Sequence, residues 1–78
     1  MSNTEQQRTI PVYWVGPVDR CDICRGKILK TFVDGATQRG PWAAMHVHCH
    51  TTFGRGFGAG LGQRYEQQPG GRWLKVEG

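Results

Sequence analysis

Two short clusters of metal-binding residues decide how this chain folds. The first reads Cys21-Asp22-Ile23-Cys24, the second reads Met45-His46-Val47-His48-Cys49-His50, and 21 residues separate Cys24 from His46. Together they contain every cysteine and every histidine of the chain. Two such clusters joined by a loop of this length can close around one tetrahedral zinc ion. The stretch therefore predicts a zinc site at the centre of the fold.

The residue types assign three of the four zinc ligands. Thiolates are the strongest side-chain partners of zinc, and the chain has three cysteines, Cys21, Cys24 and Cys49. His46 stands three residues before Cys49 and repeats the two-residue gap of the first pair, which favours it as the fourth ligand. His50 and, less favoured, His48 remain alternatives. In the alternative without a metal, the three cysteines are ordinary thiols and the histidines lie beside them by chance.

A zinc ion with four protein ligands has no coordination position left for an activated water. We therefore expect a structural ion and a protein that is not an enzyme. The segment around Cys49-His50 is distantly similar to the zinc part of HNH nucleases, which also need an upstream histidine as general base and further His or Asn residues. No histidine precedes His46 and no asparagine follows Asn3, so a nuclease is the less favoured alternative.

The short length of the chain predicts that the fold needs a stabilising staple. A chain of 78 residues has room for one domain, and such small domains seldom bury enough apolar surface to fold without a disulfide, a metal or a partner. Glycine provides 12 residues, roughly twice the usual share, which predicts many turns and a small core. A structural zinc site adds on the order of 10 kcal/mol of folding free energy.

Cysteine usage and charge indicate the compartment and the kind of partner. Three cysteines cannot all pair within one chain, and no apolar run resembles a signal peptide or a membrane span, so we expect a cytoplasmic protein without membrane association. The formal net charge is +4, but the basic residues are scattered and form no block. That balance is compatible with nucleic acid or with an acidic protein as partner.

The order of the chain predicts a small, β-dominated α+β domain of the zinc-ribbon or treble-clef kind. Residues 1–9 are polar and are expected to form a disordered leader, with a single zinc-binding domain at residues 10–78. Ile10 to Val15 has the composition of an edge strand. Cys21 to Gly26 is typical of a zinc knuckle, a tight turn that carries two ligands, with Gly26 expected to provide its backbone freedom.

Two hairpins and one short helix complete the prediction. Lys27 to Val33 is strand-like, and Asp34-Gly35 predicts a hairpin turn to a second strand within residues 36–45. His46 to Phe53 fits one or two helical turns that end at Gly54. The segments Gln63 to Gln67 and Arg72 to Glu77 predict a closing hairpin, with Tyr65 and Trp73 in the core. Trp14 and Trp42 are also expected in the core.

The run from Gly54 to Gly62 has glycine at every second position and predicts a loop. It lacks the Lys-Ser/Thr ending of a phosphate-binding P-loop. Arg55, Phe57 and Arg64 provide the charges and the aromatic ring that contact single-stranded nucleic acids, so we predict these residues as a nucleic-acid contact. In the alternative interpretation, Phe57 and Leu61 pack in a small core and the arginines are solvated.

Three further segments carry a resemblance. They are Gly40-Pro41-Trp42-Ala43-Ala44-Met45, Gly60-Leu61-Gly62-Gln63-Arg64-Tyr65 and Gly71-Arg72-Trp73-Leu74-Lys75-Val76. From Cys21 to its C-terminus the chain resembles small zinc-ribbon proteins encoded by tailed bacteriophages and prophages. Their second pair is usually Met-Cys-x-x-Cys, and His46 stands here where that pattern has its first cysteine. The resemblance implies a metal-stabilised accessory protein with His46 as a ligand.

The sequence thus predicts a structural-zinc accessory protein with two open classes of function. One is a nucleic-acid-associated module of a phage or prophage, which the positive charge and the analogy with other zinc ribbons favour. The other is a protein-binding regulator or inhibitor of a host or phage machine, which the small size and the rigid zinc scaffold favour.

Overall fold

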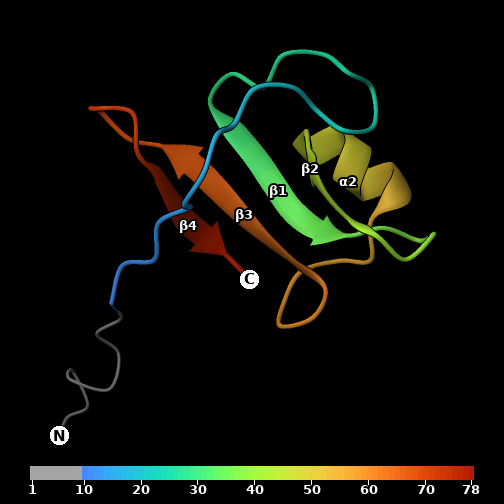
Figure 1. Cartoon of the computed structure of the whole chain (residues 1–78). Helices are drawn as coiled ribbons and strands as arrows, with labels where there is room; N and C mark the ends of the chain where they lie inside the picture. The colour runs from blue at the N-terminus through green and yellow to red at the C-terminus, as the bar shows by residue number, and fades with distance from the viewer. Residues whose placement is uncertain (1–9) are drawn as a thin grey trace, which may run out of the picture.

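Within residues 10–78, the chain forms one antiparallel sheet and one helix. The computed structural model describes residues 10–78, so the predicted leader at residues 1–9 lies outside the described residues. The elements are β1 (Thr31–Ala36), β2 (Trp42–Met45), α2 (Val47–Phe53), β3 (Gly62–Gln67) and β4 (Trp73–Glu77). The four strands lie in the order β2-β1-β3-β4 (Figure 1). This architecture confirms a small, β-dominated α+β domain with one short helix.

Aromatic side chains form the core on one face of the sheet. The Phe32 side chain on β1 is fully buried and stacks on Tyr65 of β3, with 5.2 Å between the ring centroids. Trp14 and Trp73 meet the Phe32 ring edge-on at 5.3 and 5.1 Å. Such edge-to-face pairs add stability beyond the area that they bury. The prediction of Tyr65, Trp73 and Trp14 as core residues is therefore confirmed.

Trp42 was predicted in the core, and that prediction is wrong. The side chain lies at the start of β2, an edge strand, and 46% of the residue is exposed. An edge strand has a neighbour on one side only, so fewer side chains surround each of its residues. The short strand brings Met45, rather than Trp42, to a fully buried position.

Helix α2 directly follows β2 and packs against β1 and β2. Its seven residues are too few for a stable isolated helix, so tertiary contacts must hold it. Cys49 and His50 are its buried residues, and the N–H of Gly54 donates to the carbonyl of His50 at 2.7 Å where the helix ends. The predicted helix from His46 to Phe53 is confirmed to within one residue.

The predicted hairpin turn at Asp34-Gly35 is wrong, because both residues lie inside β1. The chain turns instead at residues 37–41, where the Thr37 N–H donates to the Pro41 carbonyl at 3.0 Å. Packing explains why Gly35 is glycine: a Cβ atom there would lie 3.0 Å from the Leu61 carbonyl oxygen and 3.2 Å from the Gly62 Cα. Gly35 therefore serves a close approach of β1 and β3 rather than a turn.

Irregular segments cover both edges of the sheet. The predicted strand from Ile10 to Val15 is reduced to one bridge, Tyr13 opposite Leu74, on the outer edge of β4. Its placement at an edge agrees with the restriction that Pro11 imposes, since proline cannot donate to a ladder. At the other edge, the knuckle residue Asp22 pairs with Ala44 of β2. Covered edges protect a small sheet from pairing with other chains.

The C-terminal half matches its prediction more closely. Strands β3 and β4 form the expected hairpin, with Gln67 opposite Trp73 and Tyr65 opposite Lys75. The turn between them contains Gly70 and Gly71, both with positive φ. The glycine-rich segment before β3 is a loop, as predicted, and it leads from the end of α2 to the sheet (Figure 1).

Candidate metal centre

The four residues that the sequence selects as zinc ligands lie together. The ligand atoms of Cys21, Cys24, His46 and Cys49 are all within 4.8 Å of one another. Zinc–sulfur and zinc–nitrogen bonds of about 2.3 and 2.0 Å place the corners of a tetrahedral site about 3.5–3.8 Å apart, so a small contraction would fit the ion. Three thiolates and one imidazole are a donor set that zinc prefers, and the residues therefore fit a structural zinc ion.

Two parts of the chain bring these ligands together. Cys21 and Cys24 belong to the knuckle, which precedes the sheet. His46 lies between β2 and α2, and Cys49 lies in the first turn of α2. No disulfide joins the three cysteines. Cys21 and Cys49 are buried and Cys24 is exposed, so the centre lies at the surface of the core with one open side.

Hydrogen bonds give the knuckle its tight shape. The Cys21 N–H donates to the Gly26 carbonyl at 2.8 Å, and the Arg25 N–H donates to the Cys21 carbonyl at 2.9 Å. The turn needs one left-handed residue, and this residue is Arg25, with φ of 69°, rather than the predicted Gly26. Gly26 is needed for space, because a Cβ atom there would lie 3.3 Å from the His46 ring and 3.4 Å from the Cys24 sulfur.

Backbone amides point at the sulfur atoms. The N–H groups of Ile23 and His46 donate to Cys21 Sγ, each at 3.4 Å, and the Gly26 N–H donates to Cys24 Sγ at 3.4 Å. Hydrogen bonds of this kind favour a charged thiolate over a neutral thiol. The surroundings of both knuckle sulfurs are therefore suited to a metal-bound state, in which the thiols have lost their protons.

The two buried cysteines differ in how easily they ionise without metal. Burial opposes ionisation of Cys21, but the amide donors of Cys24, His46 and Ile23 outweigh it and lower the pKa of this thiol to about 6. Burial, together with the neighbouring Cys21 and Cys24, raises the pKa of Cys49 to about 12. A bound cation would reverse the effect on Cys49, because the thiol must lose its proton to become a ligand.

The His46 ring is held in an orientation that suits metal binding. Its Nδ1 atom lies 3.2 Å from Cys24 Sγ, and its Nε2 atom is 2.9 Å from the Lys27 carbonyl oxygen, to which Nε2–H can donate. The carbonyl of Lys27 is also the main reason why the pKa of His46 is raised. Ligand histidines are usually fixed in this way through their second nitrogen. The carbonyl of Lys27 is the partner that the sequence could not identify.

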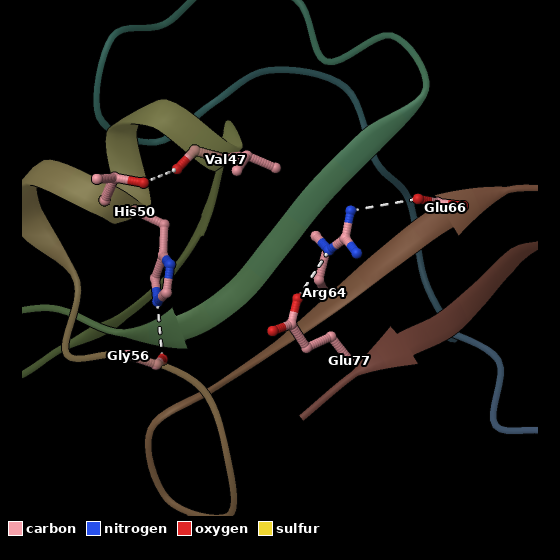
Figure 2. Close-up of polar contacts among 7 residues, drawn as sticks. Val47, His50, Gly56, Arg64, Glu66 and Glu77 are labelled. Carbon is pink, nitrogen blue, oxygen red and sulfur yellow. Dashed lines mark hydrogen bonds and ion pairs between the residues drawn. The ribbon is translucent and has the colours of Figure 1, made fainter.

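The other two histidines lie outside the group. His48 is exposed, and its ring stacks on the His46 ring with 5.1 Å between centroids. His50 is only 3% exposed and bonds through Nε2 to the Gly56 carbonyl oxygen at 2.9 Å (Figure 2). The Phe57 ring packs on the His50 ring, with 4.6 Å between the ring centroids. His50 therefore anchors the glycine-rich loop and does not join the four ligand atoms.

His50 also explains part of the glycine pattern. A Cβ atom on Gly62 would lie 3.1 Å from His50 Nε2, one on Gly35 would lie 3.4 Å from the ring, and one on Gly54 would collide with it. Three glycines from β1, β3 and the end of α2 thus surround one imidazole. Sequence reasoning missed this role, although alternating glycines do signal a close approach of other groups.

Asp22 is a second residue that sequence reasoning missed. Its N–H donates to the Ala44 carbonyl at 2.8 Å, and its carboxylate oxygen Oδ2 accepts from the Ala44 N–H at 2.9 Å. Ala44 stands two residues before His46, so this pair of bonds fixes the knuckle against the strand that delivers the second ligand pair. Its position inside a Cys-x-x-Cys sequence gave no sign of this contact.

The three residues predicted to contact nucleic acid have different surroundings. Arg55 is exposed in the loop. Phe57 is half-buried against His50, and Arg64 lies in β3 rather than in the loop. The Arg64 guanidinium pairs with Glu66 and with Glu77, each at 3.2 Å (Figure 2). A contact through these three residues stays a prediction.

Comparisons with known proteins add no relative. No protein-family model matches the chain, and no curated protein and no solved structure matches it either. Across residues 10–78, no helix has the length and apolar character needed to cross a membrane. The metal centre is therefore the feature on which a functional proposal rests.

Proposed function

We propose that the protein is a structural-zinc module of the zinc-ribbon or treble-clef-like kind, without catalytic activity. The observation that carries this proposal is the convergence of three cysteines and His46 within 4.8 Å. Four protein ligands occupy all coordination positions of a tetrahedral zinc ion and leave none for a reacting water. A centre that needs thiolates suits a reducing compartment such as the cytoplasm.

Metal content tests this part of the proposal. We expect one zinc ion per chain in protein purified without chelator, and replacement by cobalt should give thiolate-to-cobalt charge-transfer bands of a tetrahedral site with sulfur ligands. The Cys24→Ser variant should lose most of the bound metal. Full zinc content in that variant, or a cobalt spectrum typical of octahedral oxygen ligands, would contradict the proposed site.

We further propose that the module associates with nucleic acid, in keeping with its resemblance to zinc-ribbon proteins of phages and prophages. Nine Lys and Arg residues lie within residues 10–78, and within this range Arg64 alone forms an ion pair. The other eight cations are available to neutralise phosphates. Binding through phosphates releases counterions, so the affinity should fall steeply as salt rises.

The direct test is binding of labelled single-stranded and duplex DNA at several salt concentrations. A linear fall of log affinity with log salt supports phosphate contacts. Absence of binding to both probes at low salt would rule out this function for the zinc-loaded protein.

A protein-binding regulator is the second candidate, and one surface feature favours it. An open groove of about 450 Å³ lies between the knuckle, the turn after β1 and the end of α2. Its lining combines apolar, neutral polar and charged residues, namely Asp22, Ile23, Thr37, Gln38, Arg39 and Phe53. Retention of one protein partner at high salt, without salt-dependent binding of nucleic acid, would favour this candidate.

A further inference from the structure

Three cations gather at the knuckle. Arg20 and Lys27 face each other across an isolated antiparallel bridge, and Arg20 Nη1 donates to the Arg25 carbonyl at 3.3 Å. Arg20, Arg25 and Lys27 are all exposed. None of them forms an ion pair with an acidic residue in the described part of the chain. The knuckle thus presents three positive side chains on one short turn.

The pairing of Arg20 with Lys27 is unfavourable for folding. Residues opposite each other in an antiparallel pair have Cβ atoms about 4.5–5.5 Å apart, and like charges in this arrangement destabilise the pair. A Thr or Glu at either position would remove the repulsion. The sequence instead keeps two cations at this bridge, which would be favourable if an anion lay beside them.

The backbone conformation of Arg25 is a second feature that is unfavourable for folding. Its φ of 69° makes it the only residue other than glycine with positive φ in residues 10–78. A side chain on such a left-handed residue crowds its own backbone and costs folding free energy, which glycine avoids. Strain of this kind points to a role for the side chain, since the fold alone would be served better by glycine.

The metal centre and the nearby acids do not account for these cations. A zinc ion with three thiolate ligands carries a net charge of −1. This charge would balance only one of the three cationic side chains. The Asp22 carboxylate accepts from the Ala44 N–H on β2, and Asp19 forms no ion pair with the three side chains. The positive charges therefore remain open to a ligand from outside.

We propose that Arg20, Arg25 and Lys27 form a contact surface for the phosphate backbone of nucleic acid. Contacts to phosphates carry no sequence information, so this surface would bind without sequence preference. The glycine-rich loop is the less suitable surface, because Arg64 is paired with two glutamates and Phe57 packs on His50. This inference rests on the proposed nucleic-acid function and assigns its contact surface.

The test compares two sets of variants of the zinc-loaded protein. The knuckle variant carries Arg20→Ala, Arg25→Gly and Lys27→Ala, and the matched control carries Arg39→Ala and Arg55→Ala, two exposed arginines outside the knuckle. Binding of a labelled 20-nucleotide single strand and of the corresponding duplex is measured between about 50 and 300 mM salt. The knuckle variant should lose on the order of a hundredfold in affinity near 0.1 M salt and about three units of salt slope. The control, which removes two charges rather than three, should lose well under about two units of slope.

Arg25→Gly alone separates a binding role from a structural one. Glycine fits the left-handed backbone, so this variant should unfold at an equal or higher urea concentration while it binds the DNA probes more weakly. Lower stability together with unchanged binding would show that Arg25 serves the fold, and would overturn its assignment to the surface.

The remaining outcomes distinguish failure of this contact surface from failure of the proposed nucleic-acid function. If the wild-type protein binds DNA and the knuckle variant binds with the same affinity and slope, the function stands and the surface is wrong. A larger loss in the Arg39 and Arg55 control than in the knuckle variant would also move the surface elsewhere. If the wild-type protein binds neither probe, the nucleic-acid function fails and this surface assignment fails with it.

Discussion

His46 and His50 stand four residues apart, and their rings make different contacts. His46 lies beside Cys24 and is oriented by the Lys27 carbonyl, whereas His50 is buried against Gly56 and Phe57. The His46→Ala variant should lose zinc affinity by at least tenfold, because it removes a ligand. His48→Ala, the matched control on an exposed neighbour, should bind zinc like the wild type. A competition titration with a coloured chelator measures both, and equal losses in the two variants would contradict the ligand assignment.

His50→Ala should act through packing instead. It removes a buried ring that touches three glycines and a phenylalanine, and it leaves the Gly56 carbonyl without its donor. Large-to-small changes of this kind cost about 2–4 kcal/mol. Urea unfolding of the zinc-loaded protein should show this loss, while cobalt should still give the spectrum of a site with three sulfur ligands. An altered ligand spectrum would indicate that His50 binds the metal.

Asp34 lies in the middle of β1, and burial raises the pKa of its carboxyl group. A folded-state pKa above the unfolded value means that ionised Asp34 opposes folding, so stability is lost as the pH rises through the folded pKa. Asp34→Asn should therefore be more stable than the wild type at pH 8, with an advantage that shrinks as the pH falls through the raised folded-state pKa toward the ordinary range of an aspartate. Urea midpoints across this range measure the difference. Greater stability of the wild type at pH 8 would contradict the argument.

At the scale of elements, Asp22 connects the knuckle to β2. The two bonds between Asp22 and Ala44 hold the first ligand pair in register with the second. Asp22→Ala leaves the Ala44 N–H without its side-chain acceptor, so it should lower stability by about 1–2 kcal/mol and weaken zinc binding. Asp22→Asn keeps an acceptor oxygen and should restore most of both. Asp19→Ala is the control for loss of a nearby negative charge. If Asp19→Ala lowered stability and zinc binding as much as Asp22→Ala does, the hydrogen bonds between Asp22 and Ala44 would not explain the effect.

Local sequence signals located some elements and misplaced others. The ligand spacing, the helix after His46 and the closing hairpin were predictable, because each depends on residues close together in the chain. Asp34-Gly35 has strong turn propensity, but the approach of Leu61 and Gly62 to Gly35 keeps it inside a strand. Trp42 looked like a core residue, but its position on an edge strand leaves it exposed. Both errors come from contacts that connect distant parts of the chain.

At the scale of the whole molecule, the sheet order β2-β1-β3-β4 could not be predicted either. Strand β3 follows α2 and the glycine-rich loop, yet it pairs with β1 rather than with β2. Gly35 of β1 and Gly62 of β3 are partners in this register, and a Cβ atom on either would lie within 3.4 Å of the His50 ring, which bonds to Gly56 of the loop. The candidate ligands were predictable because zinc restricts them to Cys and His. The supporting groups, the Lys27 carbonyl, Asp22 and Arg25, became visible only in three dimensions.

The metal should hold the two halves of this molecule together. The knuckle belongs to the N-terminal part and the second ligand pair follows β2, so loss of the ion would release these two parts from each other. The fold would then depend on a small aromatic core alone, which we expect to unfold. A structural zinc site contributes on the order of 10 kcal/mol, which exceeds the stability expected of such a core.

Removal of zinc by a strong chelator, followed by near-ultraviolet circular dichroism and zinc analysis, tests this claim most directly. We predict that the aromatic signal of Trp14, Phe32, Tyr65 and Trp73 collapses as the ion leaves, and that one equivalent of zinc restores it. A metal-free protein that keeps the same aromatic signal and the same unfolding midpoint would contradict the account.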